Sequence, residues 1–233
     1  MNIALILSGG IGSRIDSAVP KQYIKVGNKP IIVYCMEQLF LHPQIDKVQI
    51  AADSIWREEI SRWIPKEERQ KKFQGFSDPG QNRQLSVFYA LKEIRKYAKD
   101  SDYVLIHDAA RPLLSKEQIS ACFDGIVGHE GVLPILHLKD TLYLSKDGIH
   151  ISSLLNRAEI VAGQAPEVFQ LGAYYRANQR LLPDKILEIN GSAEPAVMAG
   201  MDIAVISGEE RNFKITTKAD LERFSRIIED RKD

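Results

Sequence analysis

The sequence predicts an α/β fold with a doubly wound, mostly parallel, Rossmann-like sheet that is flanked by helices. Short apolar runs that suit buried parallel strands recur along the chain. Between them lie segments whose apolar residues repeat at helical spacing. The first apolar run, Asn2–Leu7, leads directly into a glycine-rich loop, and in sheets of this kind ligands bind beyond the carboxyl ends of the strands.

The elements alternate regularly along the chain. We expect strands at 2–7, 48–52, 103–106, 131–136 and 202–207, and helices at 31–40, 54–64, 87–94, 169–182, 193–199 and 221–228. Pro30 suits the first turn of one helix and Pro43 its end, while Thr216 or Thr217 can cap the last helix. Because no linker, repeat or low-complexity tract interrupts this order, we expect a single domain over 1–233.

The composition argues against several classes of protein. Basic and acidic side chains balance at 31 each in 233 residues, so there is no overall basic footprint for nucleic acid. The initial apolar run has no charged leader and is too short for a signal-peptide core or a membrane span. Cys35 and Cys122 lie on predicted apolar helix faces without metal-ligand spacing, which indicates buried free thiols. We therefore expect a cytoplasmic protein with no nucleic-acid or membrane partner.

The loop after the first strand has the character of a phosphate-binding site. It carries Gly9, Gly10 and Gly12, and the cations Arg14 and Lys21 follow. Glycines let backbone N–H groups approach an anion, and cationic side chains then supply charge for phosphate oxygens. The spacing matches neither a P-loop nor the dinucleotide fingerprint. A cradle for a nucleoside triphosphate is one interpretation, and a tight structural turn is the other.

Two further segments offer polar groups next to predicted elements. Residues 80–86 enter a helix with a Gly-Gln-Asn cluster, which can present polar groups to a base or ribose or can simply cap the helix. Asp108 follows a buried strand, where its carboxylate could hold Mg²⁺ beside a triphosphate. The alternative is that Asp108 only pairs with Arg111 and braces the turn.

The segment 138–162 departs from the regular pattern. Residues 138–144 alternate roughly as a strand, Lys146, Asp147 and Gly148 give a hairpin turn signal, and 149–151 return. Because an isolated hairpin is marginal in water, we expect this β-arm to leave the main sheet and pack on a second subunit, which predicts a homodimer.

Several motifs, taken together and in order, resemble one family along almost the whole chain. They are Leu-Ser-Gly-Gly-x-Gly-Ser-Arg at 7–14, Pro-Lys-Gln-Tyr at 20–23, Arg83-x-x-Ser86-Val87, His-Asp-Ala-Ala-Arg-Pro at 107–112, Asp140-Thr141, Arg157, and Asn212-x-Lys214-Ile215-Thr216-Thr217. The chain is similar to the cytidylyltransferases that act on methylerythritol phosphate and ribitol phosphate. The resemblance implies one nucleotidyltransferase domain that uses CTP, Mg²⁺ and a polyol phosphate, and that releases a CDP-polyol and pyrophosphate.

The resemblance also implies a role for each matching residue. CTP would be held by Leu7, Ser8, Gly9, Gly10, Gly12, Gly80, Gln81, Asn82, Arg83, Ser86 and Ala109. Asp108 would bind the metal, while Arg14 and Lys21 would stabilise charge as pyrophosphate leaves. Asp140, Thr141, Arg157 and Lys214 would place the acceptor phosphate, with Arg157 coming from the arm of the neighbouring subunit. Lys214 would then share one cleft with Lys21 and Asp108. The implied catalytic residues are Arg14, Lys21, Arg157 and Lys214.

The departures from the family pattern concern the acceptor. The methylerythritol enzymes usually carry Gln-Thr-Pro-Gln where this chain has Gln-Ala-Pro-Glu at 164–167, and Thr-Asp-(Asp or Glu)-Ala-Ser where it has Asn-Gly-Ser-Ala-Glu at 190–194. The Ser-Gly-Gly sequence at 8–10 is closer to the corresponding sequence of the ribitol phosphate enzymes. We therefore favour a polyol phosphate such as ribitol 5-phosphate, for a capsule or teichoic-acid-like polymer. Open alternatives are methylerythritol phosphate for isoprenoid synthesis, a sugar phosphate with another NTP, and a nucleotide binder without activity.

Overall fold

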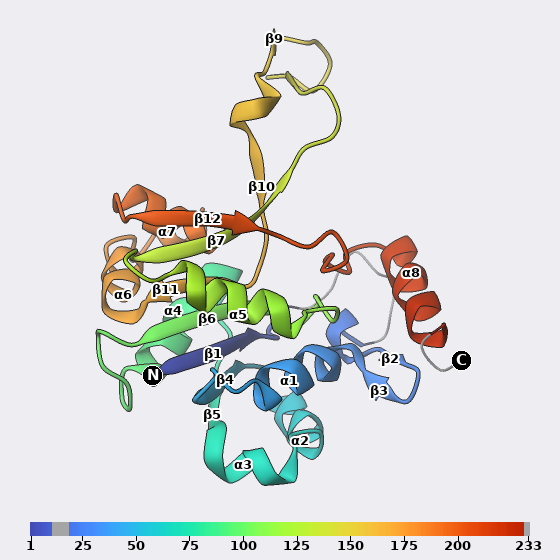
Figure 1. The fold of residues 1–233 in the computed structure, drawn as a ribbon, viewed down its shortest axis with the longest axis vertical. Coiled ribbons are helices and arrows are strands. Elements are labelled where there is room, and N and C mark those ends of the chain that lie inside the picture. The colour runs from blue at the N-terminus through green and yellow to red at the C-terminus, as the bar shows by residue number, and fades with distance from the viewer. Residues whose placement is uncertain (11–18, 231–233) are drawn as a thin grey trace.

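The computed structural model describes residues 1–10 and 19–230, and its centre is a mixed sheet (Figure 1). In spatial order the strands are β10 (Val161–Gly163), β7 (Gly131–His137), β11 (Glu167–Gln170), β6 (Tyr103–Asp108), β1 (Asn2–Leu7), β4 (Lys47–Ala51) and β5 (Phe73–Ser77), and β12 (Ile203–Ser207) pairs with β7. Strands β6, β1, β4 and β5 run parallel, as do β7 and β12, whereas β10 and β11 run antiparallel to their neighbours. The predicted α/β, mostly parallel architecture is confirmed.

Alternation along β1 explains why helices cover both faces. Ala4 and Ile6 belong to one core with residues of α1, α2 and α5, whereas Ile3 and Leu5 belong to a second core with residues of α4, α6 and α7. Successive side chains of a strand point to opposite faces, so an apolar strand needs cover on both sides. The helices are α1 (Ile31–Leu41), α2 (Ser54–Arg62), α3 (Lys66–Lys72), α4 (Arg83–Ile94), α5 (Lys116–Gly125), α6 (Leu171–Gln179), α7 (Ala193–Met198) and α8 (Lys218–Glu229).

Short polar residues start several of these helices. The side chains of Asp53, Asn82 and Ser115 accept hydrogen bonds from the first turns of α2, α4 and α5, and Thr217 forms a capping box with Asp220 at α8. Within the described ranges, none of the helices is both long and apolar enough to cross a bilayer. Cys35 and Cys122 are buried and unbridged, as predicted.

The carboxyl ends of β1 and β6 meet at one edge of the sheet. Leu7 pairs with Asp108 in parallel register, and the Ala109 amide donates to the Leu7 carbonyl at 3.0 Å. The segment before α8 is tied to the same edge, because the Ile215 amide donates to the Ala110 carbonyl at 2.9 Å. Residues that are more than a hundred positions apart therefore converge where a ligand of such a fold binds.

Both boundaries of the helix predicted at 169–182 are wrong, because α6 ends at Gln179. We expected a helix from 169, but Phe169 belongs to β11, where it pairs with Val104 and Gly131, and α6 begins at Leu171. The Phe169 ring stacks on Tyr174 with the centroids 4.2 Å apart. Periodicity does not separate a short apolar strand from the first turn of the helix that follows it. The elements α3 and β5, which the sequence analysis did not predict, lack a clear apolar pattern.

The segment between β7 and β10 projects away from the sheet as a narrow arm (Figure 1). It contains β8 (Tyr143–Leu144), the antiparallel β9 (Ser153–Leu154) and a short 3₁₀ turn, Arg157–Glu159. The predicted return strand at 149–151 is wrong, because the amides of Ile149 and His150 donate to the Asp147 carboxylate instead of to a partner strand. Other 3₁₀ turns are Lys21–Tyr23 and Lys185–Leu187, and β2 (Lys25–Val26) pairs with β3 (Lys29–Pro30) near α8.

Candidate functional site

A cavity of about 400 Å³ opens at the carboxyl ends of β1 and β6, and its size falls within the usual range for small-ligand sites. Four separate stretches of chain supply most of its lining, and one cation comes from the segment before α8. The lining residues are Leu7, Gly9, Gly10, Lys21, Gln22, Gly80, Gln81, Asn82, Arg83, Ser86, Asp108, Ala109, Ala110 and Lys214. The structure thus brings Lys21, Asp108 and Lys214 together in one cavity.

The glycine-rich loop is shaped by a buried glutamine. The Gln22 side-chain amide donates to the carbonyls of Ser8 and Gly10 at 2.8 and 2.7 Å, so these carbonyls are occupied by protein donors. A side chain at Gly9 would collide with Pro79, whose Cβ would lie 2.4 Å from the added Cβ, whereas Gly10 faces open space. Gly9 therefore allows close packing of two loops, and Gly10 leaves room in the cavity.

The loop before α4 is fixed in the same way. A side chain at Gly80 would meet the Leu85 Cβ at 2.6 Å, and the Gly80 amide donates to the Ser86 hydroxyl at 2.9 Å. The Asn82 side chain accepts from the Leu85 amide at 2.8 Å and donates to the Ile186 carbonyl at 2.9 Å. The cap interpretation of Asn82 is therefore confirmed, and the loop it braces still borders the cavity.

Asp108 stands at the centre of the charged groups. Its Oδ1 accepts from Arg83 Nε at 2.9 Å, its Oδ2 lies 2.9 Å from Lys214 Nζ, and Arg111 Nε is 3.8 Å from Oδ2. Burial alone would raise the pKa of this carboxyl, but the charges of Arg83, Lys214 and Arg111 outweigh burial and hold the pKa well below its usual range. The side chain is ionised at any physiological pH.

The remaining chemistry of the cavity is cationic. Lys21 and Lys214 are both half-buried and border the same space. Burial lowers the pKa of the adjacent His107 to about 4, so its imidazole is neutral and unsuited to proton transfer near pH 7. Within 1–10 and 19–230 no group of three or more His, Cys, Asp or Glu side chains forms a metal cluster. The site is suited to binding a polyanion, not to nucleophilic catalysis by a side chain.

The predicted residues outside the cavity fall into three groups. Gly12 and Arg14 lie outside the described residues. Ser8 is buried, and its hydroxyl bonds the Tyr23 hydroxyl at 2.8 Å. Three acceptor residues lie on the arm and do not border the cavity: Asp140, Thr141 and Arg157. All three are exposed, and Arg157 donates to the Lys139 carbonyl at the base of the arm.

Gln22 and Ala110 border the cavity but were not predicted as site residues. Gln22 is part of the Pro-Lys-Gln-Tyr motif at 20–23, and this motif is the signal that could have identified it. Ala110 has no signal of its own, since it contributes shape without a functional group.

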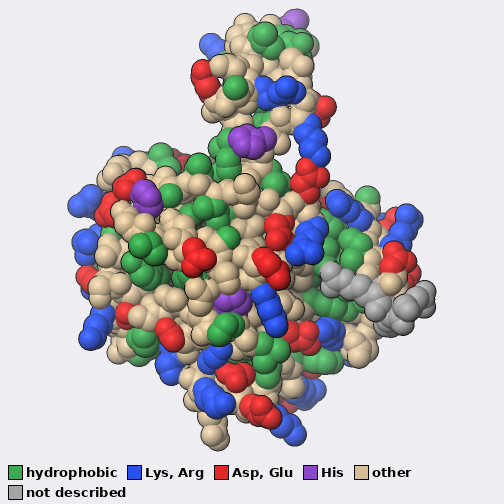
Figure 2. Space-filling model, in the orientation of Figure 1, with side chains coloured by type: hydrophobic (Ala, Val, Ile, Leu, Met, Phe, Trp, Pro, Cys, Tyr) green, Lys and Arg blue, Asp and Glu red, His purple; other side chains and the backbone are tan. Residues whose placement is uncertain are grey.

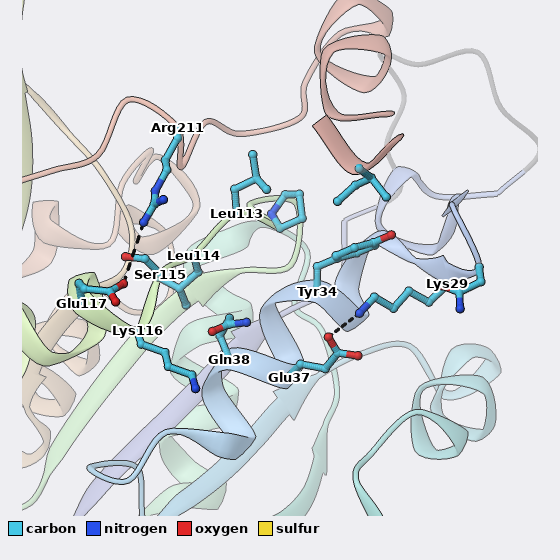
Figure 3. Close-up of a pocket in the computed structure, with 13 residues that line it drawn as sticks. Lys29, Tyr34, Glu37, Gln38, Leu113, Leu114, Ser115, Lys116, Glu117 and Arg211 are labelled. Atoms are coloured by element: carbon cyan, nitrogen blue, oxygen red, sulfur yellow. Dashed lines mark hydrogen bonds and ion pairs between the residues drawn. The ribbon is translucent and has the colours of Figure 1, made fainter. Parts of the chain in front are cut away.

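A second cavity lies behind the loop that follows Asp108, between α1 and α8 (Figure 3). Four of its five charged side chains form ion pairs, Lys29 with Glu37 and Arg211 with Glu117. A ligand would have to compete with these pairs, so this hollow is the weaker candidate.

Comparisons with known proteins find related sequences over nearly the whole chain. A family model described as "IspD: 2-C-methyl-D-erythritol 4-phosphate cytidylyltransferase" matches residues 2–230. A "Ribitol-5-phosphate cytidylyltransferase" of Vibrio parahaemolyticus is 29% identical over 231 residues, which is 98% of this chain and 96% of that protein. A "Bifunctional enzyme IspD/IspF" of Wolbachia pipientis wMel is 30% identical over 235 residues, and this chain spans 56% of its length.

Solved structures show the same fold. The Francisella tularensis 2-C-methyl-D-erythritol 4-phosphate cytidylyltransferase superposes with a TM-score of 0.79 at 25% identity, covering 96% of this chain and 97% of that one. A structure from Anaerococcus prevotii, titled as a 4-diphosphocytidyl-2C-methyl-D-erythritol synthase, superposes with a TM-score of 0.82 at 21% identity, covering 98% and 96%.

Proposed function

Given that the chain belongs to the 2-C-methyl-D-erythritol 4-phosphate cytidylyltransferase (IspD) family, we propose that it transfers the cytidylyl group of CTP to a polyol phosphate such as ribitol 5-phosphate. The products are a CDP-polyol and pyrophosphate. The observation that carries the proposal is the convergence of Lys21, Asp108 and Lys214 on one cavity beside the glycine-rich loop. The names of the ribitol-5-phosphate relatives support the acceptor class.

The proposed chemistry needs positioning more than reactive side chains. An oxygen of the acceptor phosphate attacks the α-phosphorus of CTP, and the bond from that phosphorus to the bridging oxygen of pyrophosphate breaks. Both reactants are anions, so their approach must be screened by fixed positive charge. Lys21 lies on the glycine-loop side of the cavity and is assigned to the leaving pyrophosphate, together with Arg14. Lys214 is assigned to the acceptor phosphate.

The nucleotide would be bordered by the two glycine-containing loops. Leu7, Gly9 and Gly10 line one side of the cavity and Gly80, Gln81 and Ser86 the other. The buried Ser8 supports the first loop from behind, and Asn82 both caps α4 and borders the cavity. The proposed nucleotide-binding residues also include Gly12, Arg83 and Ala109.

Asp108 is assigned to Mg²⁺. Protein Mg²⁺ sites commonly use one or two carboxylates together with substrate phosphates, and a single ionised carboxylate that borders the cavity fits this pattern. When bound, the metal supplies charge neutralisation for the triphosphate. Without ligand, Lys214 pairs with Asp108. When substrates bind, their phosphates would offer Lys214 other anionic partners.

The acceptor side is proposed to be completed by a second subunit in the cytoplasm. Asp140, Thr141 and Arg157 lie on the exposed arm, away from the cavity of their own chain. A homodimer that exchanges arms would bring these groups to the partner's Lys214-containing cavity.

Pyrophosphate release tests the proposal. Purified protein is incubated with CTP, Mg²⁺ and, separately, ribitol, other pentitol, hexitol, glycerol and methylerythritol phosphates. We expect release with a pentitol phosphate and with CTP in preference to UTP or GTP. Release with none of the acceptors would contradict the proposal.

The second candidate acceptor is methylerythritol phosphate, which the matching family description favours. Ala165 and Gly191 oppose it, because the usual Thr and Asp of that pattern are missing from these positions. Fastest release with methylerythritol phosphate in the same panel would establish this alternative.

A further inference from the structure

The Pro-Lys-Gln-Tyr motif contains a buried amide that the proposed chemistry does not use. Gln22 borders the cavity, but its side chain is only 3% exposed. It belongs to the same short 3₁₀ turn as Lys21, the cation that is assigned to the leaving pyrophosphate. Gln22 is therefore one residue away from a group that is proposed to meet the phosphates of CTP.

The side-chain amide of Gln22 has no hydrogen left for a ligand. A glutamine side chain carries two N–H donors, and Gln22 Nε2 donates to the Ser8 carbonyl at 2.8 Å and to the Gly10 carbonyl at 2.7 Å. The other polar atom, Oε1, can only accept hydrogen bonds, as can the oxygens of an ionised phosphate. Gln22 therefore does not bond a phosphate directly and acts on one through the glycine-rich loop.

The Ser8 carbonyl is fully occupied by protein donors. Besides Gln22, the Tyr23 hydroxyl donates to it at 3.0 Å, and the two bonds use both of its lone pairs. Tyr23 is itself held in place, because its ring stacks on Trp56 with the centroids 4.2 Å apart. The Ser8 amide donates to the Ala51 carbonyl at 2.8 Å. The backbone at the start of the loop is thus fixed through both its N–H and its carbonyl group.

This bonding decides which backbone groups the loop offers to an anion. In a trans peptide the N–H and the carbonyl point to opposite sides, and the Ser8–Gly9 peptide is trans. Its carbonyl is held towards Gln22, so the Gly9 N–H points away from Gln22. Among the described residues, the amides of Gly9 and Gly10 donate to no protein acceptor. The loop therefore keeps two N–H donors for a ligand, while its carbonyl oxygens are occupied.

We propose that Gln22 is a positioning residue for phosphate binding, because it occupies the carbonyl oxygens of Ser8 and Gly10 and leaves the amide donors of the loop to the two outer phosphates of CTP. This inference rests on the proposed function, since it takes the glycine-rich loop as the triphosphate site. Without the Gln22 donors, the Gly10 carbonyl would lose its bond and the Ser8 carbonyl one of two. The partial negative charge of these oxygens would then oppose a triphosphate in the cavity.

Isothermal titration calorimetry with CTP and Mg²⁺ tests the inference, and CMP, which lacks the two outer phosphates, is the reference ligand. Gln22→Met keeps the approximate size of the side chain and removes both donors. We expect its affinity for CTP to fall about tenfold, the effect of losing one or two hydrogen bonds, whereas its affinity for CMP stays within about twofold of wild type.

A second substitution separates hydrogen bonding from packing. Gln22→Glu keeps the shape of the side chain but turns a carboxylate towards the same two carbonyls, so its affinity for CTP should fall further, about 100-fold. A role in packing alone predicts the opposite order, because glutamate is closer in shape to glutamine than methionine is.

Gln118→Met is the matched control. Gln118 is also 3% exposed, lies on α5 and does not border the cavity. Its side-chain amide lies 3.9 Å from Cys122 Sγ, so the variant removes a buried amide that does not bond the loop. It should bind CTP and CMP as wild-type protein does. If Gln22→Glu does not fold, the comparison of Gln22→Met with Gln118→Met still decides the inference.

The inference is overturned if wild-type protein binds CTP no more tightly than CMP, if folded Gln22→Met binds CTP within about twofold of wild type, if Gln22→Met loses affinity for CMP equally, if folded Gln22→Glu binds CTP more tightly than Gln22→Met, or if Gln118→Met weakens CTP binding as much. Failure of the proposed function has a different signature. In that case the variants would follow the expected order of CTP affinity, and wild-type protein would release no pyrophosphate with any acceptor.

Discussion

The nucleotide cavity and the arm are built in opposite ways. The cavity lies at the edge of a buried sheet, and its side chains are positioned by β1, β6 and α4. The segment before α8 is fixed there by the hydrogen bond from the Ile215 amide to the Ala110 carbonyl. The arm has a two-stranded ribbon of four residues and keeps apolar side chains at its surface, including Ile149 at 82% and Leu154 at 66% exposure. Figure 2 shows such apolar side chains on the protruding part, clear of the main body.

The difference indicates that the groups proposed for the two substrates are held in place in different ways. The cavity groups that we propose for the nucleotide come from one chain, and core packing holds them in place. The other proposed acceptor groups, Asp140, Thr141 and Arg157, lie on an arm that cannot bury its own apolar surface. Burial of such an apolar surface against another protein is stabilising. A second copy of the chain would both bury it and complete the site.

The largest effect is expected from the cavity. Lys21→Ala should lower kcat about 100-fold or more, because charge that develops on the leaving pyrophosphate loses a fixed partner, while KM for CTP changes less. Steady-state pyrophosphate release measures both constants. Lys25→Ala, an exposed lysine four residues away, is the matched control and should behave as wild type. Turnover near wild type in Lys21→Ala would show that the cavity is misassigned.

Mixing two inactive variants tests whether the arm serves the other subunit. Lys21→Ala and Arg157→Ala should each be nearly inactive, but a mixture that is unfolded and refolded together should regain activity in about a quarter of its sites, since mixed dimers contain one composite site with both side chains. Separately refolded variants, combined afterwards in the assay, are the control. If light scattering gives a monomer, or if the mixture stays inactive, the arm does not contribute to a shared site.

The fold was predictable where local pattern and burial agree. The runs that became β1, β6 and β7 are apolar enough to be strands in any context, and their order predicts a doubly wound sheet. Phe169 was misassigned because it joins a strand only through pairing with Val104 and Gly131, which are distant in sequence. The return strand of the arm was misassigned because Asp147 captures the amides of Ile149 and His150, a competition that alternation of residue types does not reveal.

The site was predictable for residues that carry a charge or a glycine signal. Asp108 follows from its place at a strand end, and Lys214 came only from the family resemblance, because nothing local links it to a residue a hundred positions earlier. Gln22 was not recognised because its role depends on its partners, the loop carbonyls of Ser8 and Gly10. Buried polar side chains acquire meaning only when the packing around them is known.

The smallest predicted effect concerns the anchor that holds Lys214 beside the cavity. Burial opposes ionisation of Asp220, but hydrogen bonds from Thr216 and Thr217 outweigh it and lower its pKa to about 2. Because this folded-state pKa lies below the value of the unfolded chain, the carboxylate stabilises the protein above about pH 4, and that contribution is lost as pH falls towards about 2. Asp220→Asn should cost about 1 kcal/mol near neutral pH, since solvent screens a half-exposed group. Urea unfolding at several pH values should show the difference from wild type narrowing on acidification, and Glu222→Gln, two residues further along α8 and without this bonding, should show no such trend. A difference that stays constant with pH would mean that the Asp220 charge does not hold the start of α8.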